Sequence, residues 1–243
     1  MRKKLKHRLV ILGLLSAGML ALAVAPRPAR PAVPARPVQQ SSAGPLQGRI
    51  ILVDAGYGGS DGGARVRGSG AWEKDINLKT AQAIREALVQ SGATVLMTRE
   101  SDLEYHRNKR KDLTVRLDIA RQGGAQMLLS IHMNEYRSRK ESGPQVFYRK
   151  DQAQSRLLAG ILQDALIRRL EAEKKRAALA GDYFMLALDL PSALIECGFL
   201  SNAAEEKLLL TDAYRQRIAQ AVCEGVIEYF TLYPYRQTAE PMA

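Results

Sequence analysis

The sequence predicts an α/β fold with a single domain, built on a central, mostly parallel or mixed sheet of about six strands with helices on both faces. From Arg49 onward, short apolar runs alternate with longer segments whose apolar residues recur at helical spacing. This alternation is typical of an α/β layer fold. The segment 48–232 has an ordinary length for one domain, and the chain shows no internal repeat. One hydrophobic core is therefore expected.

Six apolar runs are predicted to form the strands of this sheet. Each is short, which favours a strand over a longer buried helix. The runs lie at 50–54, 94–98, 126–132, 145–149, 183–186 and 192–197.

Five segments between and after these runs are predicted to be helices. Asp75 is the expected N-cap of the first, which ends near Gly92. The others lie at 112–122, 152–172, 203–210 and 212–230. Their apolar residues recur at helical spacing and are assigned to the core. These residues are Ala83, Ile84, Ala87 and Leu88; Leu113, Leu117 and Ala120; Leu157, Leu158, Ile161, Leu162, Ala165 and Leu166; and Ile218, Ala221, Val222, Val226 and Tyr229.

Two long connections interrupt the alternating pattern. Segment 55–74 holds seven glycines, and segment 99–111 is strongly charged. Long loops in a compact domain are often functional. We expect the first loop to belong to a site, and the second to be either a solvated rim or a flap that faces the substrate.

The N-terminal segment 1–25 is predicted to be an export signal or a membrane anchor. A basic start is followed by seventeen uncharged residues, 9–25, close to the lower end of the roughly 17–25 residues that span a bilayer. Small residues at 23–25 suit a cleavage site, but Pro26 is unfavourable directly after one. Both alternatives stay open, and in either case the positive-inside rule predicts an extracytoplasmic location, with the protein secreted or anchored to the cytoplasmic membrane.

Two flanking segments are assigned no fold of their own. Residues 26–47 are rich in proline, alanine and arginine and are predicted to be a linker, because such a composition buries little apolar surface. Residues 233–243 are interpreted as a tail. The domain organisation is thus a signal or anchor, a linker, a folded domain at 48–232 and a tail.

The charge distribution argues against a nucleic-acid partner. The net charge is +11, but nine of the 36 basic residues and none of the 25 acidic residues lie in segment 1–49. The rest of the chain is therefore nearly neutral, whereas a nucleic-acid-binding domain concentrates basic charge on its folded part. Cys197 and Cys223 fall in apolar patterns, so buried free thiols are expected, with a disulfide as the alternative.

Four polar residues lie at predicted strand ends or at a helix start. They are Tyr57, Glu73, His132 and Glu196. Side chains at the carboxyl ends of strands in an open α/β sheet converge on one crevice, so the four are candidates for one metal site with a neighbouring acid or base. Taken singly, Glu73 could simply complement a helix dipole, and His132 could be a hydrogen-bonded histidine at the rim. Glu196, flanked by apolar residues, requires a partner or a catalytic role.

Four ordered segments resemble the zinc-dependent N-acetylmuramoyl-L-alanine amidases of the amidase-3 family. They are DAGYGGSDGGA at 54–64, EKD at 73–75, SIHMN at 130–134 and ECGFLSN at 196–202. The resemblance covers about 49–231. Within the family, the chain is most similar to the germination-specific amidases of the spore cortex, because of the Asp-Ala-Gly in the first segment, the charged 99–111 insertion and the tethered single-domain layout.

The resemblance implies a zinc ion with three protein ligands and a bound water. By position, Glu73 and His132 would be ligands, Glu196 would be the general base, and segment 48–232 would be the catalytic domain. The substrate would be peptidoglycan, in which the scissile amide joins the lactyl group of muramic acid to L-alanine. An accessory protein partner is open, as is the choice between vegetative wall and spore cortex.

Position 57 departs from the family pattern, because Tyr57 stands where the family has its first ligand histidine. A phenol, with a reference pKa of about 10, must lose its proton to bind zinc well. Three outcomes are open: Tyr57 coordinates weakly, another residue replaces it, or the chain is a catalytically silent binder of peptidoglycan. Besides His7 in the export segment, the remaining histidine is His106, which would reach the site only if segment 99–111 folds over it. The first hypothesis is therefore an exported amidase, and the alternative is an impaired, amidase-like wall-binding or scaffolding protein.

Overall fold

The computed structural model describes residues 44–66 and 68–234. The signal or anchor predicted at 1–25 lies outside the described residues, as do most of the linker at 26–47 and most of the tail at 233–243. That division of the chain stays a prediction. The elements are β1 (Ile50–Ala55), α1 (Glu73–Gln90), β2 (Thr94–Met97), α2 (Lys109–Gln122), β3 (Met127–Asn134), β4 (Gln145–Tyr148), α3 (Ala153–Leu170), β5 (Leu179–Ala180), the 3₁₀ helix η1 (Phe184–Leu186), β6 (Ser192–Phe199), α4 (Ala203–Leu209) and α5 (Asp212–Leu232).

The six strands form one mixed sheet in the order β2-β1-β3-β6-β4-β5. Strands β2, β1, β3 and β6 run parallel to their neighbours, while β4 is antiparallel to β6 and parallel to β5. The register places Ala55 beside Ile131 and His132 beside Glu196. The carboxyl ends of β1, β3 and β6 therefore meet at one edge of the sheet, which is where polar side chains were expected to converge.

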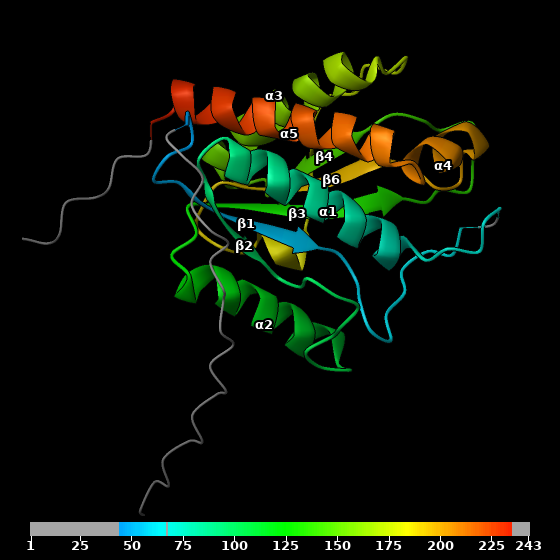
Figure 1. The fold of residues 1–243 in the computed structure, drawn as a ribbon, viewed down its shortest axis with the longest axis horizontal. Coiled ribbons are helices and arrows are strands. Elements are labelled where there is room, and N and C mark those ends of the chain that lie inside the picture. The colour runs from blue at the N-terminus through cyan, green and yellow to red at the C-terminus, as the bar shows by residue number, and fades with distance from the viewer. Residues whose placement is uncertain (1–43, 67, 235–243) are drawn as a thin grey trace, which may run out of the picture. The chain divides into compact units, whose positions relative to one another are not determined.

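Helices cover both faces of this sheet, which confirms the predicted fold class (Figure 1). Helices α1, α3 and α5 form one layer, in which α5 packs against both α1 and α3. Helix α2 lies on the opposite face and contacts η1. The site described below opens on the α2 face.

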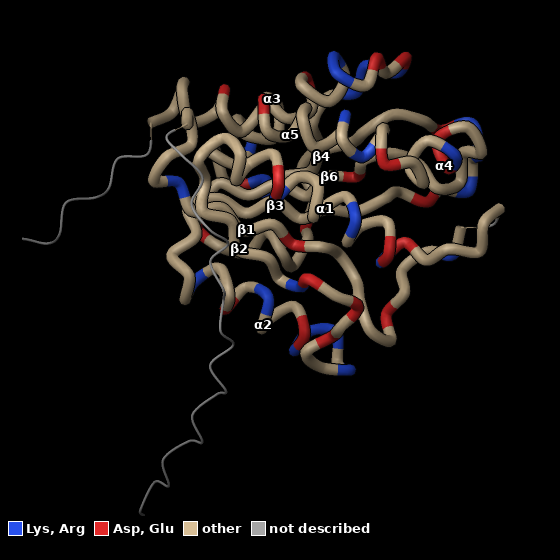
Figure 2. Tube along the Cα trace, in the orientation of Figure 1, with Lys and Arg blue, Asp and Glu red and all other residues tan. Residues whose placement is uncertain are grey.

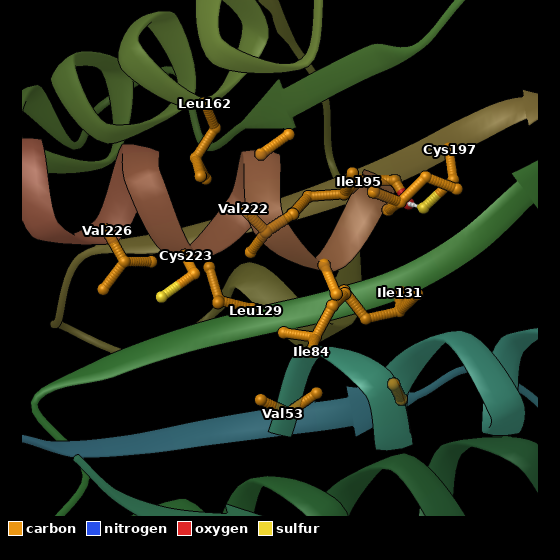
Figure 3. Close-up of a cluster of buried hydrophobic side chains, with 14 of the residues drawn as sticks. Val53, Ile84, Leu129, Ile131, Leu162, Ile195, Cys197, Val222, Cys223 and Val226 are labelled. Carbon is orange, nitrogen blue, oxygen red and sulfur yellow. Dashed lines mark hydrogen bonds between the residues drawn. The ribbon is translucent and has the colours of Figure 1, made fainter. Parts of the chain in front are cut away.

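The main hydrophobic core fills the space between the sheet and the α1, α3 and α5 layer (Figure 3). Alternate residues of the central strands point into it, because successive side chains of a strand face opposite sides. Three of their α2-facing neighbours, Asp54, Ser130 and His132, make polar interactions instead. Both cysteines are free and buried, as the sequence predicted. The core residues labelled in Figure 3 are Val53, Ile84, Leu129, Ile131, Leu162, Ile195, Cys197, Val222, Cys223 and Val226.

The strand predicted at 183–186 is wrong. These residues form η1, in which the Leu186 amide donates to the Tyr183 carbonyl at 2.9 Å, and the short strand β5 lies earlier, at Leu179–Ala180. The run is apolar because Met185 and Leu186 are buried. Burial in a turn of helix and burial in a strand leave the same short apolar signal.

The N-cap predicted for the first helix is also wrong. Helix α1 begins at Glu73 with Trp72 as its N-cap, so Asp75 lies inside the first turn. Backbone carbonyls of the glycine-rich loop accept the first amides: Ala64 accepts from Glu73 at 2.8 Å and Gly62 from Lys74 at 3.1 Å. No side-chain cap is therefore needed.

In α3, Leu157 was predicted to lie on the buried face, but its side chain is 37% exposed, whereas Leu158 is fully buried. Adjacent helical residues point about 100° apart, so two neighbouring leucines cannot both occupy the centre of one narrow buried stripe. The helical periodicity itself is confirmed.

Among residues 44–66 and 68–234, no helix is both long enough and apolar enough to cross a membrane. The anchoring predicted for residues 9–25 concerns residues outside that part of the chain. Leu46, before the first strand, is fully buried, and its amide donates to the Ser91 carbonyl at 2.9 Å.

Candidate active site

Two buried arginines hold the turn that follows β1. Arg116 of α2 donates to the carbonyls of Ala55 and Tyr57, each at 2.8 Å. Arg99, just beyond β2, donates to the carbonyls of Ala55 and Gly56 at 2.9 and 3.0 Å. The carbonyl oxygens of three successive residues are thus paired inside the protein, which avoids the cost of burying unpartnered backbone groups.

Arg116 is itself neutralised by two carboxylates. It forms ion pairs with Asp54 at 3.1 Å and with Asp112 at 2.8 Å, and its side chain is 2% exposed. Burial alone would raise the pKa of Asp54, but the charge of Arg116 and a hydrogen bond from Ser130 outweigh it and hold that pKa below its usual value. Asp54 is therefore a buried carboxylate that anchors the arginine under the turn.

Tyr57 occupies the tip of this turn in a left-handed backbone conformation, with φ of 62°. Few residues other than glycine adopt this conformation without support, and the arginine bonded to its carbonyl provides that support. Its ring contacts the His132 ring edge to face, with centroids 5.0 Å apart, and the Lys109 ammonium lies 5.2 Å from its centroid. Burial, followed by the negative charges of Glu73 and Glu196, raises the pKa of the phenol well above its usual range.

Glu73 is the first residue of α1, and its side chain accepts hydrogen bonds from three elements. One carboxylate oxygen accepts from the Met133 amide at 3.2 Å and from the Asn77 side chain at 3.3 Å. The other accepts from the Ala64 amide at 3.0 Å. Glu73 is 3% exposed, so this buried carboxylate is oriented by the glycine-rich loop, by β3 and by its own helix.

His132 lies between Glu73 and Glu196. Its Nδ1 is 3.4 Å from a Glu73 oxygen, and in the β3–β6 register it is paired with Glu196. Burial opposes protonation of the imidazole, but the hydrogen bond to Glu73 and the charges of both glutamates outweigh it and raise the His132 pKa. The site thus concentrates negative charge around one imidazole, an arrangement that favours a cation.

Gly56 allows the His132 ring to lie against the turn. A Cβ at this position would come within 2.2 Å of the His132 ring, a distance that real structures do not tolerate. Gly56→Ala is therefore expected to displace the imidazole and to lower the free energy of unfolding by about 1–3 kcal/mol, as overpacking does. Urea denaturation and hydrolytic activity measure the two effects.

Gly160→Ala in α3 is the matched control for that substitution, because no atom lies within 4 Å of its added Cβ. An alanine inside a helix is favoured over glycine by about 1 kcal/mol, so the control is expected to be as stable as the parent or more so. Equal stability of both variants would contradict the proposed contact between position 56 and His132.

Glu196 lies on β6 with one carboxylate oxygen, Oε2, buried and accepting no hydrogen bond from any residue within the described part of the chain. Burial is the largest influence on this group, and it raises the Glu196 pKa to about 7 even though the positive charge of His132 acts in the opposite direction. A carboxyl group with a pKa near neutrality both accepts and releases a proton easily, which suits acid–base catalysis.

A hollow of about 400 Å³ lies beside these residues on the α2 face of the sheet. Tyr57, His132 and Glu196 contribute to its wall, and η1 provides an apolar side with Phe184 and Met185. The charged segment 99–111 also lines the hollow. Its contributing residues are Glu104, His106, Arg107 and Lys109. Arg107 and Lys109 line the hollow and are exposed, so both roles expected for that segment, a solvated rim or a flap facing the substrate, stay open.

Because His106 belongs to segment 99–111, it lines the same hollow as His132. Its Nδ1 accepts a hydrogen bond from the Asn108 amide at 2.8 Å, so in the neutral imidazole the proton resides on Nε2. In this tautomer His106 is a hydrogen-bond donor, and binding a metal would require breaking the bond to Asn108 or losing the Nε2 proton.

The donor set fits a zinc ion only in part. Buried Glu73 lies close to half-buried His132, and Glu196, with its unpartnered oxygen, lines the same hollow as His132. Within residues 44–66 and 68–234, however, no group of three His, Cys, Asp or Glu side chains is arranged to hold a metal. The third position depends on Tyr57, whose raised pKa opposes the phenolate form.

Sequence reasoning missed the residues that support the site. Arg99 and Arg116 lie in charged segments that resemble ordinary surface, and Asn77 is one polar residue within a helix. Asp54 alone left a signal, since it is an acid at the end of an otherwise apolar strand.

Comparison with known proteins gives matches over nearly all of the folded part. The family model of N-acetylmuramoyl-L-alanine amidases (Amidase_3) matches residues 51–228. The germination-specific N-acetylmuramoyl-L-alanine amidase of Bacillus subtilis is 40% identical over 196 residues, which cover 77% of this chain and 82% of the relative.

Solved structures match as well. The CwlD amidase from Clostridioides difficile, solved in complex with the GerS lipoprotein, has a TM-score of 0.70 and 35% identity, covering 76% of this chain and 99% of that chain. An N-acetylmuramoyl-L-alanine amidase from Clostridium difficile 630 also has a TM-score of 0.70, with 27% identity over 79% of this chain and 98% of that chain.

Proposed function

Because the chain belongs to the N-acetylmuramoyl-L-alanine amidase family, we propose that it hydrolyses the amide bond between N-acetylmuramic acid and L-alanine in peptidoglycan. The observation that supports this most is the convergence of Glu73, His132 and Glu196. These residues come from a helix start and from two adjacent strands, and all three are within interaction range of one another. Amide hydrolysis requires a polarised carbonyl, an activated water and a proton for the leaving amine.

Zinc is the cofactor that we propose for this site, with Glu73 and His132 as ligands. When bound with an open coordination position, zinc polarises a carbonyl and lowers the pKa of water to about 7. Glu73 is suited to hold a cation because the Met133, Asn77 and Ala64 hydrogen bonds fix its orientation. Tyr57 would be the third ligand, and a weak one, because its phenol must first lose a proton.

Glu196 is the proposed general base. Its unpartnered oxygen Oε2 is free to accept a proton from the attacking water. The same carboxyl group would then deliver that proton to the nitrogen of the leaving L-alanine. Burial maintains a pKa near 7, so the two transfers are nearly balanced in energy.

We propose that the activity lies outside the cytoplasm and serves the remodelling of the cell wall or the spore cortex. The uncharged segment 9–25 after a basic start supports export, and the Bacillus subtilis relative is germination-specific by name. The Clostridioides difficile relative was solved with a lipoprotein, and on this basis we include an accessory protein among the partners of this chain.

One observation favours a second function, that of a peptidoglycan-binding protein without turnover. The raised pKa of Tyr57 disfavours metal binding, and a chain that cannot hold zinc would retain the hollow but not the reaction. The two functions differ in the zinc content of the purified protein.

Tyr57→His is the substitution that separates them. The full-length parent is expected to hold less than one equivalent of zinc, and the variant about one, because neutral imidazole binds zinc without first losing a proton. Hydrolysis of muropeptides is expected to rise in parallel. Elemental analysis of the purified proteins and detection of newly released L-alanine amino groups provide the measurements.

Tyr57→Phe is the matched control, since it keeps the ring against His132 and removes only the phenol oxygen. A further fall in zinc content in this variant would assign coordination to the phenolate, whereas an unchanged content would show that Tyr57 does not coordinate. Equally tight zinc binding in the parent and in Tyr57→His would contradict the view that Tyr57 weakens the site. A zinc-free parent that binds peptidoglycan without cleaving it would establish the second function.

A further inference from the structure

A second hollow, of about 470 Å³, lies beyond the ends of β3 and β6. We call it the α4 hollow, and it is lined by Arg65, Glu135, Tyr136, Arg137, Arg139, Leu200, Ser201, Ala203 and Glu206. None of these residues belongs to the site described above. We propose that the α4 hollow binds the peptide side of the substrate, by recognising a stem-peptide side chain that ends in a carboxylate and an ammonium group together.

The α4 hollow is built on the same strands as the active site. Beyond His132 and Glu196, β3 and β6 continue side by side: the Leu200 amide donates to the Asn134 carbonyl at 2.8 Å, and the Tyr136 amide donates to the Ser201 hydroxyl at 3.1 Å. The remaining wall includes Arg65, which directly follows Ala64, the residue whose amide holds Glu73. The α4 hollow and the active site therefore share the strands β3 and β6 and the glycine-rich loop.

The spacing suits a peptide that extends from the scissile bond. Glu135 lies three residues beyond His132 along the chain, which keeps the backbones of these two residues within roughly 10 Å of each other. An extended peptide spans at most about 3.3–3.6 Å per residue. The third residue of a stem peptide whose first residue is the L-alanine at the scissile bond would thus reach the α4 hollow.

Three arginines give the α4 hollow its capacity for carboxylates. Arg137 and Arg139 are exposed, and their side chains form no hydrogen bond or ion pair with any residue in the described ranges. Arg65 is partly engaged, since it donates to the Gly70 carbonyl at 3.4 Å and stacks on Trp72 at 5.4 Å. Guanidinium groups left without protein partners are suited to bind a carboxylate in a bidentate manner.

Two carboxylates line the α4 hollow together with these arginines, and they make it selective. They belong to Glu135 and Glu206, and acidic and basic residues are both seen around α4 in Figure 2. A purely anionic ligand would be repelled by the two glutamates, and a purely cationic one by the arginines. A side chain that ends like an amino acid, as in diaminopimelate, satisfies both sets, whereas lysine offers only the ammonium group.

This inference rests on the proposed function, because it assigns the α4 hollow to the same substrate. It is tested by binding, so that catalysis is not required. Two tripeptides, L-alanyl-γ-D-glutamyl-diaminopimelate and the same peptide ending in lysine, are titrated into the full-length Glu196→Gln protein. The diaminopimelate peptide is expected to bind about tenfold more tightly, which corresponds to about 1.4 kcal/mol.

The double variant Arg137→Gln/Arg139→Gln in that background is expected to reduce the preference to less than about twofold. Arg156→Gln is the matched control, because Arg156 is an exposed arginine of α3 that does not line the α4 hollow, and it is expected to keep the preference. Surface substitutions of this kind change stability by only about 0.5 kcal/mol, so all variants should fold.

Equal binding of the two tripeptides to the parent, absence of binding by both, or a preference that survives the double variant would each overturn the inference. Displacement of both peptides by inorganic phosphate with equal effect would also overturn it, because the α4 hollow would then be a general anion site for a phosphate-bearing wall polymer. The proposed function fails on a different result: an intact tripeptide preference in a parent protein that releases no L-alanine amino groups from muropeptides.

Discussion

Glu196→Gln is expected to lower the rate of muropeptide hydrolysis by about 10²–10⁴-fold, the usual contribution of a general acid–base group. Glutamine has nearly the same size and shape as glutamate but cannot accept the proton of the attacking water. The buried, unpartnered oxygen Oε2 is the atom whose chemistry is removed. Initial rates of amine release on purified peptidoglycan, measured with full-length protein, give the size of the effect.

The same variant distinguishes a base from a ligand. If Glu73 and His132 hold the metal, the zinc content of Glu196→Gln equals that of the parent, and only turnover is lost. A variant that loses zinc together with activity would show that Glu196 is a ligand. Glu228→Gln, on the exposed surface of α5, is the matched control and should change neither quantity.

Arg116→Met is expected to lower the free energy of unfolding by about 3–5 kcal/mol, because removing one partner leaves buried charges without compensation. Asp54, 1% exposed, would lose its cation, as would Asp112. The carbonyls of Ala55 and Tyr57 would also lose their donor. Urea denaturation at neutral pH measures the stability, and activity should fall even where the protein remains folded, since the turn carrying Tyr57 loses its support.

Arg168→Met provides the comparison, because Arg168 forms an exposed ion pair with Glu228 at 3.6 Å. Exposed pairs contribute about 0–1 kcal/mol, so this variant should be nearly as stable as the parent. Similar destabilisation by both substitutions would argue against a special role of the buried arginine.

The pH dependence of stability follows from the same ion pair. The pKa of Asp54 is lowered in the folded protein by Arg116 and Ser130, against the opposing effect of burial. The stabilisation is therefore fully present above the unfolded pKa of about 3.8 and is lost as the pH falls through the lower folded value. In Arg116→Met the lowering is removed, and acid unfolding should begin at a higher pH.

Much of the fold could be predicted because its signals are local. The strand at 50–54 and the helix at 212–230 were placed within two residues of β1 and α5, since apolar periodicity over such lengths has one simple structural solution. Segment 183–186 was misplaced because four apolar residues are too few to show a period. The helix start at Glu73 was misplaced because its partners, Ala64 and Gly62, belong to a loop about ten residues earlier.

The site was predictable for a different reason. Tyr57, His132 and Glu196 follow or end apolar runs, and parallel strands bring such positions to one edge. The structure lines one hollow with these three residues and places Glu73 3.4 Å from His132. Their chemical roles stay proposals, which the zinc and rate measurements above are designed to test.

The sequence by itself determined the layer architecture, the candidate residues and the family, because periodicity, strand-end polarity and ordered motifs are properties of short segments. Only the tertiary structure decided how position 57 is held. Arg99 and Arg116 lie 42 and 59 residues after Tyr57 along the chain, and their bonds to the turn exist only once β1, β2 and α2 have packed together. The burial and nearby carboxylates that raise the pKa of Tyr57 likewise arise from folding, since both depend on distances through space rather than along the sequence.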